Sequence, residues 1–377
     1  MSEITELLWQ LVAIDSVNPD LVAGGAGESA IARFVASWLE EAGLEVRIEE
    51  AAPERPNVIA LARGTGGGRS LLLNAHLDTV GVSGMPRPHD PYIEGNRLYG
   101  RGAYDMKAGL AAIMIAASMA RRQSLRGDVI LTAVCDEEFA SIGTSSVVKR
   151  WHADAAILTE PTQLDICIAH KGFCWLDIET TGVAAHGSLP QVGVDAIVKM
   201  GKVLVGLEEL DRSLQAGPAH PLLGTGSLHA ALITGGQELS SYPERCLLSV
   251  ERRTVPGETR ELVEQQIRVI LDRIAASDPQ FQATMKTMLT QVPFEISEDE
   301  PIVRTLLRQA TSVLGKEPGV GGAFGWMDSA LLAAAGIPTV IFGPGGAGAH
   351  AVVEWADLDQ LQRCADVLVA TINEFCS

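Results

Sequence analysis

Four apolar runs in this chain break off at a histidine or an acidic residue. The first covers residues 71–75 and ends in His76, and the others lead into residues 136–138, into Glu160, and into a glycine-rich stretch before His350. Short apolar runs with polar ends are typical of buried strands, and open α/β sheets bind ligands beyond the carboxyl ends of their strands. The pattern predicts an α/β fold that gathers acids and histidines at one sheet edge.

The length of 377 residues exceeds what one hydrophobic core usually serves, which favours two domains. Strands and helices alternate over residues 1–170 and again over 290–377, so we expect a catalytic domain with a mixed, mostly parallel sheet flanked by helices. Residues 171–289 follow the order strand, helix, strand, strand, helix, strand. They predict a smaller α+β domain that interrupts the first.

The charge balance is strongly acidic, with 29 basic and 47 acidic residues and a net charge of −18. An acidic surface argues against binding to nucleic acid or to anionic membranes. The six cysteines form no C-x-x-C pair, which indicates reduced, structural thiols. The N-terminus carries acids where a signal peptide has positive charge, and the apolar stretch 108–120 is too short to cross a bilayer. We therefore expect a cytoplasmic protein.

A glycine run, residues 64–68, lies between the second expected strand and the strand that ends at His76. A dinucleotide-binding loop must open a helix, and here another strand follows. The run therefore predicts a hairpin loop.

Five side chains are candidate metal ligands: His76, Asp105, Glu138, Glu160 and His350. This number is too large for one catalytic zinc with an open position, but it suits two ions that share a bridging carboxylate. We expect Asp105 to be the bridge, with His76 and Glu160 on one ion and Glu138 and His350 on the other. Asp105 also precedes an expected helix, so the competing interpretation is a helix N-cap.

The adjacent residues Glu137 and Glu138 cannot point the same way from extended backbone. If Glu138 binds metal, Glu137 faces the water, whose pKa a metal lowers to about 7. We predict that Glu137 is the general base and then protonates the leaving amine. The alternative for this segment is a solvated acidic turn.

His76 and Asp78 are two residues apart and share one face of a strand. That spacing suits an imidazole that binds metal and an acid that orients it. A plain polar strand end is the alternative interpretation.

These motifs together resemble one family. Ala75-His76-Leu77-Asp78, residues 100–107, Asp136-Glu137-Glu138, residues 159–162 and Gly343-Pro344-Gly345 with Ala349-His350 are similar to the co-catalytic zinc amidohydrolases. That family includes acetylornithine deacetylase, succinyl-diaminopimelate desuccinylase, aminoacylase and glutamate carboxypeptidase, and the resemblance covers essentially the whole chain. It implies the metal and base roles given above, with Asp78 orienting His76.

The resemblance also implies roles in the inserted domain, which in the family is a lid and commonly the interface of a homodimer. His186 matches a histidine that stabilises the oxyanion, often in the partner subunit's active site, and such a donor is worth about 3 kcal/mol in the transition state. Arg253 matches an arginine that binds the substrate's α-carboxylate. The spacing to the following Pro256-Gly257 favours Arg253 over Arg252.

Three departures from the family pattern concern the expected substrate pocket. Ser240 stands three residues before Pro243, where many relatives have asparagine, residues 322–329 differ from the usual threonine-aspartate loop, and Gly346 replaces a frequent aspartate. We treat Ser240 as a substrate-binding candidate. The departures leave the hydrolytic residues intact and the identity of the substrate open.

The expected function is metal-dependent hydrolysis of the amide bond of an N-acyl amino acid, with two divalent ions, zinc first and cobalt or manganese as alternatives. An exopeptidase acting on short peptides through the same site is the main alternative. A catalytically idle metal-binding scaffold is a third, although no ligand is missing. A serine or cysteine hydrolase is disfavoured because no nucleophile occupies a suitable turn.

Overall fold

The computed structural model describes all 377 residues, and the chain divides into two compact units. The first unit consists of Met1–Ile168, Ile296–Gly321 and Met327–Ser377, and the second of Ala169–Glu295 and Gly322–Trp326. The insert expected over residues 171–289 lies within the second unit. The sequence pattern assigns residues 169–170, 290–295 and 322–326 to the catalytic domain, but they pack in the second unit.

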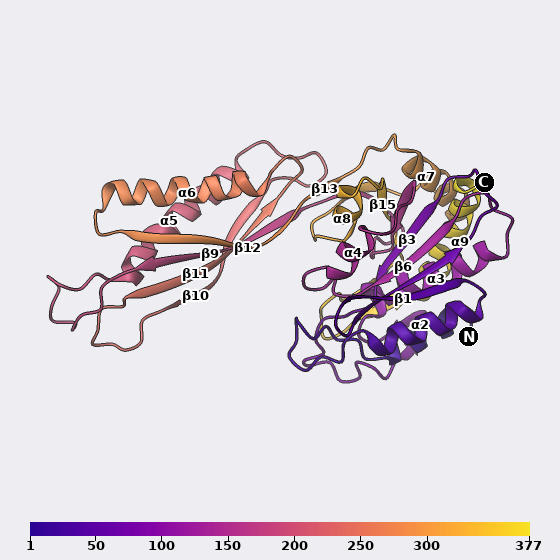
Figure 1. Cartoon of the computed structure of the whole chain (residues 1–377), viewed down its shortest axis with the longest axis horizontal. Coiled ribbons are helices and arrows are strands. Elements are labelled where there is room, and N and C mark those ends of the chain that lie inside the picture. The colour runs from indigo at the N-terminus through magenta and orange to yellow at the C-terminus, as the bar shows by residue number, and fades with distance from the viewer. The chain divides into compact units, whose positions relative to one another are not determined.

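Most strands of a nine-stranded sheet belong to the first unit, while β13 and the ends of β8 and β14 belong to the second. The strand order of this sheet is β1-β2-β6-β3-β7-β15-β8-β13, with β14 paired to β8 (Figure 1). Its strands are β1 (Glu45–Ala52), β2 (Arg55–Ala62), β3 (Leu71–His76), β6 (Val129–Val134), β7 (Ala155–Leu158), β8 (Ile166–His170), β13 (Phe294–Glu295), β14 (Val320–Ala323) and β15 (Thr339–Ile341). The strands β6, β3, β7 and β15 are parallel, and β1, β2, β8 and β13 pair antiparallel. The predicted mixed α/β sheet with flanking helices is confirmed. The expectation that it is mostly parallel is wrong, because parallel pairing is confined to the central strands and the outer strands pair antiparallel.

The central strands are apolar along their whole length because both faces of the sheet are covered. Every residue of β2, β3, β6 and β7 is buried, as expected for strands between helical layers. On one face, α4 (Ile142–Val147) packs near Ile59 and Ile130, and α8 (Ser329–Ala334) packs near Leu72 and Ala156.

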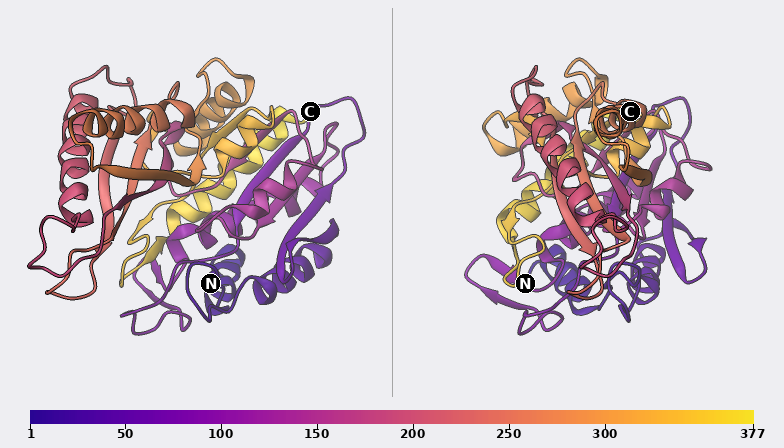
Figure 2. Two further views of the ribbon diagram at one scale, coloured as in Figure 1. Left: turned by 60° about the vertical axis from the view of Figure 1, so that its left-hand side comes forward. Right: turned by 90° about the vertical axis from the view of Figure 1, so that its left-hand side faces the viewer.

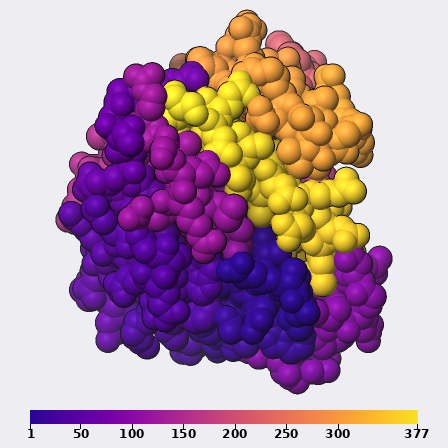
Figure 3. Space-filling model, turned by 90° about the vertical axis from the view of Figure 1, so that its right-hand side faces the viewer, coloured from indigo at the N-terminus to yellow at the C-terminus, as the bar shows by residue number.

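The remaining helices of the first unit are α1 (Glu3–Ala13), α2 (Ser29–Glu41), α3 (Ala108–Arg121), α7 (Pro301–Leu314) and α9 (Leu358–Phe375). The most buried of them, α3, contacts α1 and α9, while α7 contacts α9 and α2 packs on β1 and β2. Figure 3 shows the C-terminal segment, in yellow, between the N-terminal segment and the residues near 300. The apolar stretch 108–120 is thus a buried core helix, and none of the helices has the length and apolarity that a bilayer span requires.

The hairpin predicted around the glycine run is wrong. Strands β2 and β3 both pair with β6, which lies between them, so the connecting loop crosses the end of β6. A Cβ at Gly64 would lie 2.4 Å from the Arg126 carbonyl oxygen, and one at Gly68 would lie 2.4 Å from the Gly127 nitrogen. The glycines allow close backbone approach at this crossing.

A small four-stranded sheet in the first unit joins two loops that are distant in sequence. Its strands are β4 (Tyr92–Glu94), β5 (Arg97–Tyr99), β16 (Gly346–Ala347) and β17 (Trp355–Asp357), in the order β16-β17-β5-β4. Strand β5 leads into the segment that carries Asp105, and β16 and β17 flank the loop that carries His350. Their pairing, Trp355 opposite Tyr99, brings these segments together.

The second unit is an antiparallel sheet with two helices on one face (Figure 2). Its elements are β9 (Gly172–Thr181), α5 (Ala196–Gln215), β10 (Ser227–Gly235), β11 (Arg245–Thr254), α6 (Arg260–Ser277) and β12 (Gln282–Gln291). Alternate residues of β9 and β11 are buried against α5 and α6, in a core that includes Leu176, Leu248, Val203 and Ile267. The α+β composition predicted for the insert is present, in the predicted order.

Candidate metal centre

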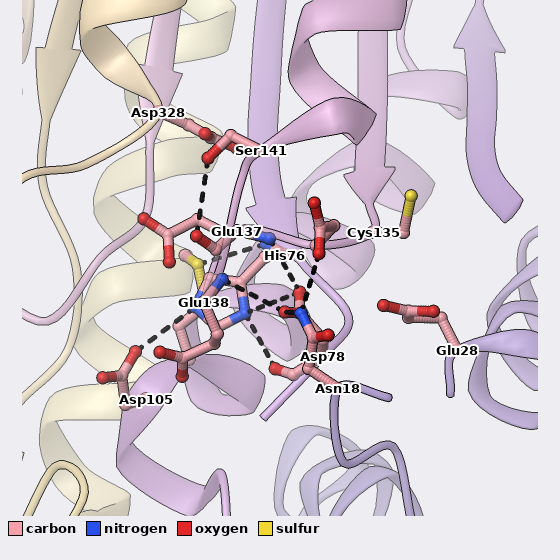
Figure 4. Close-up of polar contacts among 12 residues, drawn as sticks. Asn18, Glu28, His76, Asp78, Asp105, Cys135, Glu137, Glu138, Ser141 and Asp328 are labelled. Carbon is pink, nitrogen blue, oxygen red and sulfur yellow. Dashed lines mark hydrogen bonds and ion pairs between the residues drawn. The ribbon is translucent and has the colours of Figure 1, made fainter. Parts of the chain in front are cut away.

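The candidate metal ligands lie where strands of the large sheet end. His76 is the last residue of β3, Glu138 follows β6, and Glu160 comes just after β7. His350 lies in the loop between β16 and β17, and Asp105 lies in a short π-helical turn, η1 (Ala103–Lys107), that leads into α3. Figure 4 shows His76, Asp105 and Glu138 converging beyond the strand ends. The structure thus brings all five predicted ligands to one place.

Asp105 lies between the two histidines. One of its carboxylate oxygens is 3.3 Å from His76 Nε2, and the other is 3.4 Å from His350 Nε2. On the His76 side, Nε2 is 3.6 Å from a Glu160 oxygen, and on the other side His350 Nε2 is 3.1 Å from a Glu138 oxygen. This division matches the two ligand sets expected from the sequence, with Asp105 common to both.

The helix N-cap interpretation of Asp105 does not hold. Helix α3 begins at Ala108, the residue at its N-cap position is Lys107, and no side chain caps it. Asp105 itself has non-helical backbone angles, and its peptide bond to Met106 is cis. The carboxylate is therefore directed at the histidines rather than at the helix amides.

The electrostatics of the cluster fit a site for cations. Burial, together with neighbouring carboxylates, raises the pKa of Glu138 to about 7 and raises the pKa of Glu160 well above its ordinary value. Glu138 Oε1 and Glu160 Oε1 are buried and have no hydrogen-bond partner. Buried carboxylate oxygens without hydrogen bonds are costly, and divalent ions would satisfy these oxygens and neutralise the repulsion between the two carboxylates. The donor set of imidazole nitrogens and carboxylate oxygens is one that zinc accepts.

The acids around His76 and His350 raise the pKa values of both imidazoles. Hydrogen bonds that the His350 ring donates to the carboxylates of Asp105 and Glu138 raise the pKa of His350 to about 10. Burial acts to lower the pKa of His76, but Glu160, Asp105 and Asp78 outweigh it and raise that pKa. The same two histidines hold the pKa of Asp105 below its usual range despite its burial. Bound cations would take the place of the protons that these shifts favour.

Glu137 and Glu138 lie on different sides of the cluster. Ligand atoms of His76, Glu137 and Glu160 are within 4.8 Å of one another, and so are those of His76, Asp105 and Glu138. Burial and the nearby Glu160 raise the pKa of Glu137 well above its ordinary value. A carboxylate held beside the cluster with elevated basicity has the properties of a general base.

Asp78 contacts backbone amides rather than the imidazole of His76. Its carboxylate accepts hydrogen bonds from the amides of Glu137 and Glu138, both at 3.1 Å, and from the Asn18 side chain at 2.8 Å. His76 Nδ1 instead donates to the backbone carbonyl of Asp78 at 2.9 Å, while the nearest Asp78 carboxylate oxygen is 3.7 Å away. His76 is therefore oriented by the Asp78 backbone, and Nε2 is left to face the acids.

Sequence reasoning missed a buried network beneath the turn that carries Glu137. Asn18 also donates to Asp136 at 3.0 Å, and Arg55 joins Asp136 at 2.9 Å to Glu28 at 2.8 Å. Asp136 has a left-handed backbone with a φ of 67°. Such strain in a non-glycine residue persists where its surroundings fix it, often at functional sites. Nothing in the local sequence marks Asn18 or Arg55 as part of the site.

Asp328 is a second buried acid that the sequence pattern did not single out. It lies in the loop noted for its departure from the family pattern and accepts a hydrogen bond from Thr144 at 2.6 Å. Burial raises its pKa to about 6, and it contributes to the raised pKa of Glu137.

Comparison with known proteins places the chain in a family. The model described as "Peptidase family M20/M25/M40" matches residues 72–374. The chain belongs to this peptidase family. The predicted resemblance, and the predicted class of metal-dependent hydrolase acting on linear amide or peptide bonds, are confirmed.

Two curated relatives align with the chain over nearly its full length. The N-formyl-4-amino-5-aminomethyl-2-methylpyrimidine deformylase of Bacillus subtilis is 30% identical over 410 aligned residues, which cover 100% of this chain and 95% of that protein. The acetylornithine deacetylase of Myxococcus xanthus is also 30% identical, covering 98% and 96%. A solved structure, the B. subtilis YXEP protein described as a dinuclear metal binding peptidase of family M20, has a TM-score of 0.76 at 18% identity, covering 99% of this chain and 98% of that one.

In this M20 chain, the neighbouring residues Arg252 and Arg253 of the second unit differ in burial. Arg252 is fully buried, and its guanidinium bonds Glu258 and the Arg253 carbonyl. Arg253 is about a third exposed, bonds Glu251, and lies 5.3 Å from the centre of the Phe173 ring. Arg252 is therefore a structural residue, and Arg253 is the one available to a ligand.

His186 and Ser240 lie on neighbouring loops of the same unit. His186 is exposed at its ring, with Nδ1 2.8 Å from the Ser188 hydroxyl, and it forms an isolated bridge with Ser241. The amide of Gly187 donates to the Ser240 carbonyl at 2.7 Å. The structure brings these two predicted residues together within the second unit.

Proposed function

We propose that this chain removes a short acyl group from a small N-acyl amino acid by hydrolysing its amide bond. The observation that carries the proposal is the Asp105 carboxylate, whose oxygens face His76 and His350 at 3.3 and 3.4 Å. The two curated relatives are named for removing a formyl and an acetyl group from nitrogen. An exopeptidase is the second candidate, because the family model and the solved relative are described as peptidases.

Two divalent ions fit the residues of this site. One would be held by His76, Asp105 and Glu160, and the other by Asp105, Glu138 and His350. We propose zinc as the native metal, with cobalt or manganese as alternatives. When bound, such ions lower the pKa of water and polarise a carbonyl group. Elemental analysis of the purified protein, with a stoichiometry near two per chain, tests this assignment.

The chain's own residues would then carry the proton. Glu137 takes a proton from the attacking water as the new C–O bond forms, and it gives that proton to the amide nitrogen as the C–N bond breaks. The products are a carboxylate and an amine. We also propose that His186 donates a hydrogen bond to the oxyanion, that Arg253 binds the substrate's carboxylate, and that Ser240 contacts the substrate. The partial exposure of Arg253 supports that role.

A substrate panel tests the reaction. N-formyl and N-acetyl amino acids, including N-acetylornithine, are compared with dipeptides and tripeptides at equal concentration, with amine release as the readout. A higher kcat/KM for the N-acyl amino acids supports the deacylase function. A higher kcat/KM for the peptides would contradict it and favour the exopeptidase function.

Glu137→Gln tests the proton transfer. The amide of Gln cannot accept a proton from water, so we expect kcat to fall by about 100- to 10,000-fold. Metal content should stay at the wild-type level, because Glu137 is outside both proposed ligand sets. Turnover at the wild-type rate would contradict the role given to Glu137.

We further propose that the protein is a cytoplasmic homodimer that associates through the second unit. The six cysteines are all free and buried, as in proteins of reducing compartments. The exposed apolar side chains of β10, among them Leu232 and Ile233, support the interface.

A further inference from the structure

Glu354 is a buried acid with four hydrogen bonds, placed immediately before β17. One carboxylate oxygen accepts from Arg101 Nη1 at 2.7 Å and from the Gly102 amide at 3.0 Å. The other accepts from the amides of Tyr104 and Asp105 at 2.9 and 3.0 Å. Both oxygens are therefore saturated by donors from one segment, residues 101–105, and the side chain is 1% exposed.

The segment that Glu354 holds carries the bridging ligand, and Glu354 itself follows His350 by four residues. Two more hydrogen bonds tie the same segments together, from the Gly100 amide to the Glu354 carbonyl at 3.2 Å and from Arg101 Nη2 to the Ala351 carbonyl at 3.0 Å. His350 has a left-handed backbone with a φ of 61°, so its loop must be fixed by neighbours to stay in place. Glu354, at the end of this loop, ties it to residues 100–105.

We propose that Glu354 is a positioning residue for the metal centre, which sets Asp105 relative to His350. The inference rests on the proposed function, because it concerns the ion that those two ligands share. A carboxylate is required because four donors converge on it, including a guanidinium that is 2% exposed. Hydrogen bonds between a charged acceptor and amides are stronger than neutral ones, and a neutral amide side chain would turn an NH₂ group toward two of these donors.

The ion between Asp105, Glu138 and His350 depends on Glu354 most, since two of its ligands are placed by that residue. The ion at His76, Asp105 and Glu160 depends on it through Asp105 alone. Loss of Glu354 should therefore weaken one ion much more than the other. A purely structural role would lower the free energy of unfolding without this selectivity.

The test measures metal binding by the full-length protein. Wild type, Glu354→Gln and Glu354→Asp are titrated with Zn²⁺ against a competing chelator, and the visible spectrum of the Co²⁺ form is recorded for each. Residues that support metal ligands typically change affinity by about 10- to 100-fold, and we expect that loss for one of two ions in Glu354→Gln. Glu354→Asp keeps the charge beside Arg101 but withdraws its oxygens from the amides, so we expect an intermediate loss.

Glu258→Gln is the matched control. Glu258 also pairs with a buried arginine, Arg252, and accepts a backbone amide, that of Val255 at 2.9 Å, but it lies in the second unit. The Glu258→Gln variant should therefore bind both ions with wild-type affinity.

If wild type binds no metal, the proposed function fails, and the inference fails with it. If wild type binds two ions and Glu354→Gln binds them equally well, only the inference is overturned. Failure of both Glu354 variants to fold would also overturn it, since the residue would then hold the fold rather than the ligands.

Discussion

Two buried carboxylates outside the proposed ligand sets hold the backbone of residues that belong to those sets or lie beside them. Asp78 accepts the amides of Glu137 and Glu138, and Glu354 accepts those of Tyr104 and Asp105. Each acid therefore fixes the backbone of a segment whose side chains carry the chemistry. Groups held within a fraction of an ångström need such support, and here it comes from backbone hydrogen bonds rather than from contacts with the ligand side chains.

The Asp78→Asn variant tests whether the Asp78 carboxylate holds the backbone of Glu137 and Glu138 or orients the His76 ring. An asparagine turns an NH₂ group toward the amide of Glu137 or Glu138, so the catalytic turn should shift and kcat should fall by about 10- to 100-fold. His76 keeps its acceptor, the backbone carbonyl of residue 78. We therefore expect two ions per chain in the variant. If the variant instead lost the ion at His76, and its kcat per fully loaded chain stayed at the wild-type value, the result would favour the role that the family resemblance implies, in which the Asp78 carboxylate orients His76.

Sequence alone identified the candidate ligands because each follows a recognisable apolar run or motif. It did not identify Asn18, Arg55 or Glu354 as site residues, because they act on groups that are distant along the chain. Asn18 reaches Asp78 across 60 positions, and Glu354 reaches Gly102 across 252. No local periodicity encodes such contacts. The spacing of four residues between His350 and Glu354 was visible, but it had no interpretation until the fold paired β17 with β5.

At the scale of elements, the approach of α3 to the end of β7 sets the position of Glu160. A Cβ at Gly109 would lie 2.1 Å from the Thr159 carbonyl oxygen, so only glycine allows this contact. We expect Gly109→Ala to lower the free energy of unfolding by about 1–3 kcal/mol, as overpacking does, and to weaken metal binding by displacing Glu160. Chemical denaturation and chelator titration measure the two effects.

Gly201→Ala is the control for that prediction. Gly201 lies within α5, and a Cβ there meets nothing within 4 Å. Alanine should stabilise the helix by about 0.5–1 kcal/mol. If both variants gained stability alike, the close packing at Gly109 would not be the controlling factor.

The second unit contains an ion cluster that should make its stability depend on pH. Asp278 at the end of α6 pairs with Lys199 and Lys202 of α5 at 2.6 and 2.7 Å, and these hydrogen bonds lower the pKa of Asp278. A carboxyl whose folded-state pKa is depressed stabilises the fold above its unfolded pKa, about 3.9, and loses that contribution as the pH falls further. The melting temperature of Asp278→Asn should therefore lie below wild type at neutral pH. The gap should shrink below pH about 4.

Asp272→Asn, on the exposed side of the same helix, provides the comparison. Its melting temperature should track wild type across the whole pH range. A gap between Asp278→Asn and wild type that stayed constant down to pH about 2 would show that the ion cluster does not titrate as described.

Element order was predictable from periodicity, since the helices and strands of the second unit follow one another in the order that the apolar pattern predicted. The pairing of the two strands that flank residues 64–68 was not predictable, because antiparallel and parallel neighbours give similar apolar runs. Only the fold shows that β6 inserts between β2 and β3. The assignment of residues 322–326 to the second unit likewise depends on contacts rather than on any local signal.

At the scale of the whole molecule, the nine-stranded sheet and the sheet of the second unit have edge strands of opposite character. Strand β1, at the edge of the nine-stranded sheet, carries Glu45, Arg47, Glu49 and Glu50, and charges of this kind discourage pairing with another chain. Strand β10, at the edge of the second unit's sheet, has no acidic residue, lysine or arginine and exposes Leu232 by 71% and Ile233 by 54%. An exposed, uncharged edge is suited to pairing with a second copy.

Leu232→Lys tests whether this edge forms the proposed homodimer. In a two-fold interface each substitution acts twice, and loss of a buried leucine costs about 1.5–3 kcal/mol per copy. The dissociation constant should therefore rise by at least about 100-fold, and light scattering after size exclusion should show a monomer where wild type is a dimer. Ile48→Lys, at an exposed position of β1, should leave the dimer intact. A dimer that resisted Leu232→Lys but dissociated with Ile48→Lys would move the interface to the first unit, and a monomeric wild type would refute the homodimer itself.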